Sequence, residues 1–364
     1  MNPSPRPRVS VIIPAYNHER FVGEAIYSVL EQSWADFEIV ITDDGSSDGT
    51  VGVIQKIKDP RIKLICFPEN KGACIAANRC VEESSGEYIA MLSSDDVFLR
   101  EKLATQVAFL DQNPKVGAVL GYPLLIDEEG HAFSGKNGFR QANRTRFEWL
   151  NQFFFGGNCL CHPSALIRKQ CYQEIGLYDP RFSQLPDFDF WIRLCLKYDV
   201  HILPENLIKF RMSRNQTNAS AGTFDNQLRS GFEAWKILFH YTAPFVKEHA
   251  QEIFPGFNTF PVPSTCNSFE VRLAHLALQR NSQPHKLFAL DLLLEQQRSG
   301  DLPAREFSRV IAGLGAADLQ DFFANRKSSA FNLRMKHWLR SCLPAKARSS
   351  LRKRLSTVDS WLRD

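Results

Sequence analysis

Two short stretches near the N-terminus decide the fold: VSVIIPAYN at residues 9–17 and FEIVITDDGSSDGT at residues 37–50. Each begins with an apolar run rich in β-branched residues and ends in polar residues, as a buried strand of a parallel sheet does. Two more apolar runs follow, IKLICF from residue 62 and YIAML from residue 88. Helical patterns separate the four runs at residues 21–32, 50–58 and 74–84. This alternation predicts βαβ units and a parallel sheet with helices on both faces.

Further along the chain the same rules predict two helices, at residues 99–113 and 188–198. They also predict strands at residues 118–126, 164–167, 200–203 and 207–210. After about residue 218 only helical patterns remain. The predicted fold class is therefore α/β, a Rossmann-like, mostly parallel sheet followed by a helical C-terminal region. The predicted segments are residues 1–218, 219–325 and 326–364.

The composition limits the classes of protein to which this chain can belong. The chain has 364 residues, 44% hydrophobic and 23% charged, with a formal net charge of +4, which is typical of a globular protein. Its nine cysteines include no C-x-x-C pair, which excludes a zinc ribbon or a thioredoxin-like site. The one cluster, Cys159-Leu160-Cys161-His162, is compatible with burial or with a metal. No apolar run is long enough for a transmembrane helix or a signal peptide, so we expect a cytoplasmic protein, or one held at the inner face of the membrane.

Ligands of such sheets bind at the carboxyl ends of the strands. That rule selects four loops, at residues 14–20, 43–48, 68–72 and 93–96. The first loop has no G-x-G-x-x-G, and no G-x-x-x-x-G-K-[ST] occurs anywhere, which argues against a dinucleotide-dependent dehydrogenase and a P-loop NTPase.

Two aspartate pairs lie in these loops. Asp44 could accept a ring N–H from a nucleobase, or its loop could be only a turn in which Asp48 caps the next helix. Asp95 and Asp96 repel each other, and a hard divalent cation would relieve that repulsion. Because adjacent side chains of an extended segment point to opposite sides, one carboxylate would bind the metal and the other a ribose hydroxyl. The alternative is a cap of a helix at residues 97–103.

A third acidic feature is PDFDFWIRL at residues 186–194. Asp187 could cap the helix that begins there, or, beside an aromatic cluster, it could have a raised pKa and act as a general base. Phe188, Trp191 and Leu194 or Cys195 follow the spacing of a buried helical face.

These motifs, in this order and together with CHPSALIRK at residues 161–169, resemble family 2 glycosyltransferases of the inverting type with the GT-A fold. The resemblance covers residues 8–212. It implies a donor site built from Pro14, Ala15, Tyr16, Asn17, Asp44, Lys71, Gly72 and Asp95. It also implies Mn²⁺ or Mg²⁺ at Asp96, a catalytic base at Asp187, and His162 and Trp191 near the acceptor.

Three positions depart from the family pattern. Ser93 and Pro186 stand where many members carry acidic residues, and Arg211-Met212-Ser213 stands where Arg-x-His is frequent. The resemblance implies transfer of a sugar from a nucleotide-diphospho-sugar, with a UDP-sugar favoured, to a hydroxyl of a glycan or lipid-linked glycan. The departures leave one alternative, a catalytically silent module that binds a nucleotide-sugar and serves as an interaction platform.

The last 39 residues, 326–364, are strongly basic. They hold eleven lysines and arginines against two aspartates, a net charge of +9, so the rest of the chain is mildly acidic at −5. Apolar residues recur there at helical spacing on both sides of Pro344. Two interpretations stand, docking on the protein's own core or binding to an anionic membrane surface, and we expect no nucleic acid partner.

Overall fold

The structure, a computed structural model, describes residues 6–133, 137–212, 223–262, 267–280 and 282–313. The chain divides into two compact units, Met1–Pro255 and Gly256–Asp364. The boundary predicted after residue 218 and the whole basic segment 326–364 lie outside the described residues, so both stay predictions.

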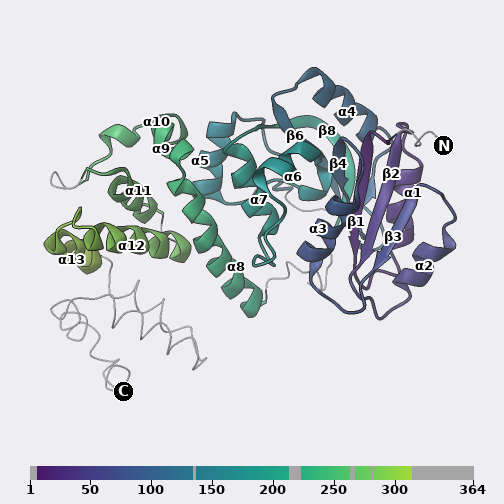
Figure 1. The fold of residues 1–364 in the computed structure, drawn as a ribbon, viewed down its shortest axis with the longest axis horizontal. Helices are drawn as coiled ribbons and strands as arrows, with labels where there is room; N and C mark the ends of the chain where they lie inside the picture. Colours follow the sequence, from purple (N-terminus) through teal and green to yellow (C-terminus); the bar gives the residue numbers. More distant parts are fainter. Residues whose placement is uncertain (1–5, 134–136, 213–222, 263–266, 281, 314–364) are drawn as a thin grey trace, which may run out of the picture. The chain divides into compact units, whose positions relative to one another are not determined.

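One eight-stranded sheet organises the first unit, in the order β3-β2-β1-β4-β7-β6-β8-β5 (Figure 1). The strands are β1 (Val9–Ala15), β2 (Phe37–Asp43), β3 (Ile62–Cys66), β4 (Tyr88–Met91), β5 (Val97–Phe98), β6 (Val116–Ile126), β7 (Leu166–Arg168) and β8 (Asp199–Arg211). Strands β3, β2, β1 and β4 run parallel, as do β6 and β8. β7 is antiparallel to both of its neighbours, and β5 is antiparallel to β8. The predicted mostly parallel sheet is confirmed.

The helices of this unit are α1 (Val22–Leu30), α2 (Thr50–Lys56), α3 (Ala73–Glu83), α4 (Lys102–Gln112), α5 (Arg146–Gly156), α6 (Lys169–Ile175), α7 (Pro186–Cys195), α8 (Phe224–Ile237), α9 (Pro244–Glu248) and α10 (Ala250–Ile253). Short 3₁₀ turns occupy η1 (His162–Ser164) and η2 (Leu238–Thr242).

Helices cover both faces of the sheet, as predicted. Val9, Val11 and Ile13 of β1 point into a buried apolar cluster that α1 and α4 complete. On the opposite face α3 packs against β1 and β2, and its Cys80 thiol donates to the Thr42 hydroxyl of β2 over 3.1 Å. Burial on both faces explains why the strands are apolar almost throughout.

Several elements differ from the prediction. The two last strands are one strand, β8, because register shifts between β6 and β8 keep residues 204–206 within the ladder. The helix expected from residue 99 begins at Lys102, since residues 97–98 pair with β8 as β5. No element is predicted at residues 146–156, which form α5, a helix that starts with a reciprocal cap between Thr145 and Glu148.

The second unit is helical in its described part, as predicted. It contains η3 (Phe257–Thr259), α11 (Phe269–Leu278), α12 (Gln283–Arg298) and α13 (Ala304–Gly313). Arg272 of α11 is buried and donates to the carbonyls of Phe257 and Phe260, which ties η3 to α11. Among the described residues, no helix combines the length and apolar character that a membrane span requires.

Gly45 is the glycine on which the β2 turn depends. Its φ of +69° lies in the left-handed region, and a Cβ there would lie 2.5 Å from the backbone carbon of Glu69. Gly130 has a φ of +84°, but a Cβ there would meet nothing within 4 Å. A side chain at Gly130 would therefore cause backbone strain alone, whereas a side chain at Gly45 would cause both strain and steric overlap.

Replacing each glycine by alanine tests this difference by urea unfolding. We expect Gly130→Ala to cost about 1–2 kcal/mol, the strain of a left-handed alanine. Gly45→Ala should cost about 2–5 kcal/mol, because overpacking against residue 69 adds to the same strain. Equal losses of unfolding free energy in the two variants would show that the backbone at residue 69 shifts without a measurable cost.

Candidate donor and acceptor site

Hydrogen bonds join the first loop to two of the others at the carboxyl edge of the sheet. The Asn17 amide N–H donates to Ser46 Oγ over 2.9 Å, and Asn17 Oδ1 accepts from the Ser47 amide over 2.8 Å. Asn17 is the one described non-glycine residue with a positive φ, +51°. His18 Nδ1 and Ser94 Oγ lie 2.7 Å apart, which links this loop to the loop after β4.

Asp44 joins the second and third loops. Its Oδ1 accepts from the Lys71 amide over 2.7 Å and its Oδ2 from the Gly72 amide over 2.9 Å, directly before α3. The Asp44 amide in turn donates to the Ala15 carbonyl over 2.8 Å. A carboxylate here also suits the positive N-terminus of α3. The four predicted loops thus form one continuous edge. Asp48 is not the N-cap of α2, which is Gly49, but its Oδ1 accepts from the Thr50 amide over 2.9 Å.

Asp95 and Asp96 differ sharply in environment. Asp96 is 1% exposed; its Oδ1 accepts from the Arg211 amide over 2.8 Å, and its buried Oδ2 meets no hydrogen-bond partner among the described residues. Burial, and then the charge of Asp95, raise the pKa of Asp96 well above its usual value. Asp95 is partly exposed, and burial raises its pKa too, against the opposing influence of His18.

This pair has the chemistry that a divalent cation needs. A buried carboxylate oxygen without a donor, beside a second carboxylate, is a hard anionic site whose repulsion a cation would remove. The helix-cap alternative is wrong, because β5 follows the pair and α4 begins only at Lys102. The residues therefore fit Mn²⁺ or Mg²⁺.

Arg211 lies behind the aspartate pair, at the end of β8, and is 4% exposed. Its Nε donates to the Asp95 carbonyl over 2.8 Å and its Nη2 to Glu24 Oε2 over 2.6 Å. Its Nη1 donates to the carbonyls of Asp127 and Glu128 over 3.0 and 3.1 Å. Arg211 is thus a buried support of the aspartate loop; Ser213 lies outside the described residues.

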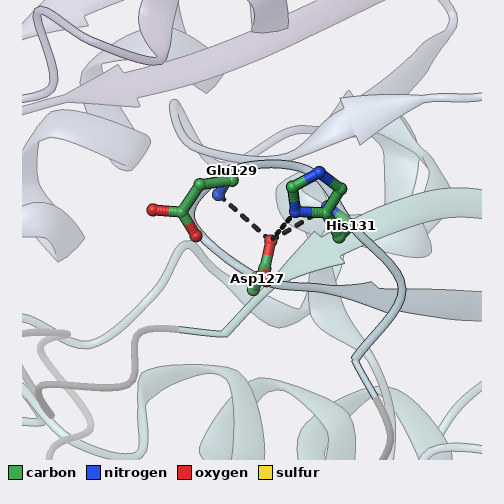
Figure 2. A group of neighbouring side chains, drawn as sticks. All are labelled: Asp127, Glu129 and His131. Atoms are coloured by element: carbon green, nitrogen blue, oxygen red, sulfur yellow. Dashed lines mark hydrogen bonds and ion pairs between the residues drawn. The ribbon is translucent and has the colours of Figure 1, made fainter.

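Figure 2 shows a second group of potential metal ligands, Asp127, Glu129 and His131, in the turn after β6. Asp127 Oδ1 accepts from the amides of Glu129 and His131 over 3.1 and 2.9 Å, so the carboxylate shapes the turn. Glu129 and His131 are exposed. Local turn geometry accounts for Asp127 without a cation.

Asp187 is partly exposed near the start of α7. Its Oδ1 accepts from the Phe188 amide over 2.8 Å, and its Oδ2 accepts from Asn158 Nδ2 over 2.6 Å. Burial raises the pKa of Asp187 to about 6, and the bond from Asn158 opposes that rise. A carboxylate of this pKa is largely ionised at pH 7 and still basic enough to take a proton.

His162 and Trp191 lie together on one side of this region. The rings meet edge-on with centroids 5.6 Å apart, and Trp191 is fully buried. His162 is partly exposed, its Nε2 lies 2.7 Å from the Tyr178 hydroxyl, and burial lowers its pKa to about 4. Burial, and after it the charges of Asp96 and Asp187, raise the pKa of the Cys161 thiol well above its usual value.

Comparison with known proteins identifies the family. Residues 10–176 match the model of glycosyl transferase family 2. An uncharacterized glycosyltransferase of Rickettsia prowazekii is 30% identical over 231 residues, which cover 63% of this chain and 70% of that protein. The chain belongs to glycosyltransferase family 2. The predicted enzyme class is confirmed, and the catalytically silent alternative is not supported.

Two further proteins resemble this glycosyltransferase. TuaG of Bacillus subtilis, whose name assigns it to teichuronic acid biosynthesis, is 37% identical over 125 residues, 34% of this chain and half of TuaG. The S. aureus TarS fragment 1–349 has a similar fold, with a TM-score of 0.55 at 18% identity over 81% of this chain and 88% of the fragment. Its complex with UDP-GlcNAc gives a TM-score of 0.52 at 17% identity over 81% and 92%. These likenesses confirm the predicted GT-A type of fold.

Three supporting residues of the glycosyltransferase were not predicted: Asn158, Arg211 and Glu233. Glu233 of α8 is 5% exposed, and its two carboxylate oxygens accept from the amides of residues 183, 184 and 185 over 2.8–2.9 Å. Those three amides lead directly into α7 and Asp187. Asn158 follows the Gly-Gly break that ends α5, a local signal that could have singled it out. Glu233 lies on an amphipathic helix that also carries Asp225, and this pattern gives no such signal.

Glu233→Gln is expected to lower the free energy of unfolding by about 1–3 kcal/mol. The glutamine NH₂ group would face backbone N–H donors, so at least one of the three partly buried amides would lose its acceptor. Glu252→Gln on α10 is the matched control, since that side chain is 53% exposed and its loss should stay within about 0.5 kcal/mol. Urea unfolding at pH 7 measures both; similar losses would remove Glu233 from this supporting role.

Proposed function

We propose that this glycosyltransferase moves a sugar from a nucleotide-diphospho-sugar, with a UDP-sugar favoured, to a hydroxyl of a glycan or lipid-linked glycan, and inverts the anomeric configuration. The TarS fragment was crystallised with UDP-GlcNAc, and the name of TuaG refers to teichuronic acid biosynthesis, which together support this donor and acceptor class. The observation that carries the proposal is the Asp187 carboxylate near the start of α7, which is partly exposed, is held by the Phe188 amide and by Asn158, and has a pKa raised to about 6.

The acceptor hydroxyl would lose its proton to Asp187 as its oxygen attacks the anomeric carbon from the face opposite the diphosphate. In a single in-line displacement one C–O bond forms while the bond to the diphosphate breaks, and the proton remains on Asp187. Neutral His162 would lie on the acceptor side, with Trp191 packed behind its ring. Proton removal by a positioned base contributes about 10²–10⁴-fold.

The donor would lie along the joined loops. Pro14, Ala15, Tyr16 and Asn17 would line the nucleotide, and Asp44 would meet the base through oxygen lone pairs that the two amides leave unused. The exposed Lys71, with Gly72, would border the same site. Asp95, the more exposed of its pair, would bind the ribose.

Asp96 would hold Mn²⁺ or Mg²⁺ through its unpaired oxygen. When bound, the ion supplies electrostatic stabilisation of negative charge on the departing diphosphate. We also propose that the protein works in the cytoplasm and that residues 326–364 hold it at an anionic membrane surface, where a lipid-linked acceptor would be available.

A thermal-shift panel of UDP-, GDP- and dTDP-sugars tests the donor site. We expect a UDP-sugar with Mn²⁺ to stabilise the wild type by about 2.7 kcal/mol at a hundredfold excess over Kd. EDTA or Asp96→Asn should remove most of this gain, because Asn keeps the bond to the Arg211 amide but lacks the charge. The exposed Asp199→Asn serves as the control. A panel without any stabilising donor would overturn the donor-site assignment.

Asp187→Asn tests the base. Donor affinity should stay within about twofold, whereas UDP release from UDP-GlcNAc with water as acceptor should fall 10²–10⁴-fold. In the wild type the rate should rise with pH and level off above about pH 6, because only the ionised carboxylate accepts a proton. Retained turnover in the variant would take the role of base away from Asp187.

A further inference from the structure

Asn158 makes a side-chain hydrogen bond to Asp187 that neither the family motifs nor the comparisons assign. Gly157, with a φ of +77°, ends α5, and Asn158 is the next residue of the loop toward η1. Its Nδ2 lies 2.6 Å from Asp187 Oδ2. A contact of this length to a carboxylate is a charge-assisted hydrogen bond, among the stronger ones in proteins.

The orientation of the Asn158 amide is fixed by a second bond. The Leu160 backbone N–H donates to Asn158 Oδ1 over 3.1 Å. A backbone N–H can only donate, so the side-chain oxygen must face Leu160 and the NH₂ group must face Asp187. Asn158 therefore presents a donor to the carboxylate and has no equivalent alternative orientation.

Each of the two hydrogen bonds to Asp187 uses a different carboxylate oxygen. Oδ1 accepts from the Phe188 amide and Oδ2 from Asn158, so each oxygen keeps one lone pair for a further proton. The Phe188 bond joins adjacent residues and leaves the side chain free to pivot. The bond from Asn158 comes from another segment of the chain and fixes the direction of the carboxylate.

Three titratable groups on the segments near Asp187, the Cys161 thiol, the Tyr178 hydroxyl and the His162 ring, carry no charge near its titration. Burial raises the pKa values of the Cys161 thiol and the Tyr178 hydroxyl well above their usual values and lowers the pKa of His162 to about 4. Asp189, two residues along α7, is paired with Arg193 and bonded to His240. Among the described side chains, Asn158 is thus the donor that favours the ionised form of Asp187.

We propose that Asn158 is the positioning residue of the base: it aims the Asp187 carboxylate and keeps it ionised at neutral pH. This inference rests on the proposed role of Asp187 as general base. Asn158 acts through Asp187 and need not contact either substrate.

The direct test is the titration of Asp187 by ¹³C NMR of protein labelled at aspartate carboxyl carbons, with the resonance assigned by its loss in Asp187→Asn. This measurement needs neither donor nor acceptor. We expect a wild-type midpoint near pH 6 and, in Asn158→Ala, a midpoint higher by about one pH unit, a tenfold change in proton affinity. Asn158→Asp places a second carboxylate against the first, so the pair should titrate in two steps with the upper midpoint higher still.

Asn151→Ala is the matched control, since Asn151 lies on α5 and donates to the Ile253 carbonyl, away from Asp187. Its Asp187 midpoint should equal that of the wild type. The pH at which UDP release from UDP-GlcNAc reaches half its maximum should move with the midpoint in Asn158→Ala, while donor Kd stays constant. A merely structural role would lower thermal stability and leave the midpoint in place.

The outcomes separate the inference from the proposed function. An unchanged Asp187 midpoint in both folded Asn158 variants overturns the inference, even where Asp187→Asn abolishes turnover. A shifted midpoint together with full turnover in Asp187→Asn keeps the electrostatic contact but overturns the role of Asp187 as base, and with it the positioning role. A shifted midpoint with a matching shift of the rate profile supports both.

Discussion

The site depends on one buried cation, the guanidinium of Arg211. Burying a charge is costly unless its donors are satisfied, and here every group of the guanidinium has an acceptor. The acceptors come from α1, from the loop after β4 and from the turn after β6, while Arg211 itself ends β8. Its backbone amide also holds Asp96. The loop that carries the acidic pair is therefore fixed from both halves of the sheet at once.

The pKa of Asp187, the proposed base, is raised by a different cause from the one that the family pattern suggests. Pro186 stands where a glutamate is common, so the preceding residue contributes no negative charge. Burial raises the pKa of Asp187 instead, and Asn158 limits the rise. Proline also suits the first turn of α7, where its missing N–H costs nothing. The departure from the pattern thus leaves a carboxylate that can still exchange a proton near neutral pH.

Local pattern predicted much of this molecule. The alternation of apolar runs and helical patterns was sufficient to predict β1 to β4 and their parallel direction, because buried parallel strands and their crossover helices are encoded within some 25 residues. The rule for strand ends selected the four loops that hydrogen bonds now join at Asn17 and Asp44. By contrast, the contacts of Arg211 and Glu233 link residues tens of positions apart. No periodicity records such pairings, and β5 was missed because two residues are too few for a pattern.

The contacts of Glu233 show that the loop before the proposed base, Asp187, is held by residues outside the segment that matches the family model. The match to the family model ends at residue 176, before Asp187, and the loop that delivers Asp187 is held by a helix almost fifty residues further on. Residues 10–176, which match the family model, therefore do not contain every residue of the proposed site. Exchange of residues 10–176 between relatives would transplant the proposed donor loops together with Asn158 and His162, but would leave behind Asp187 and the α8 carboxylate that holds its loop.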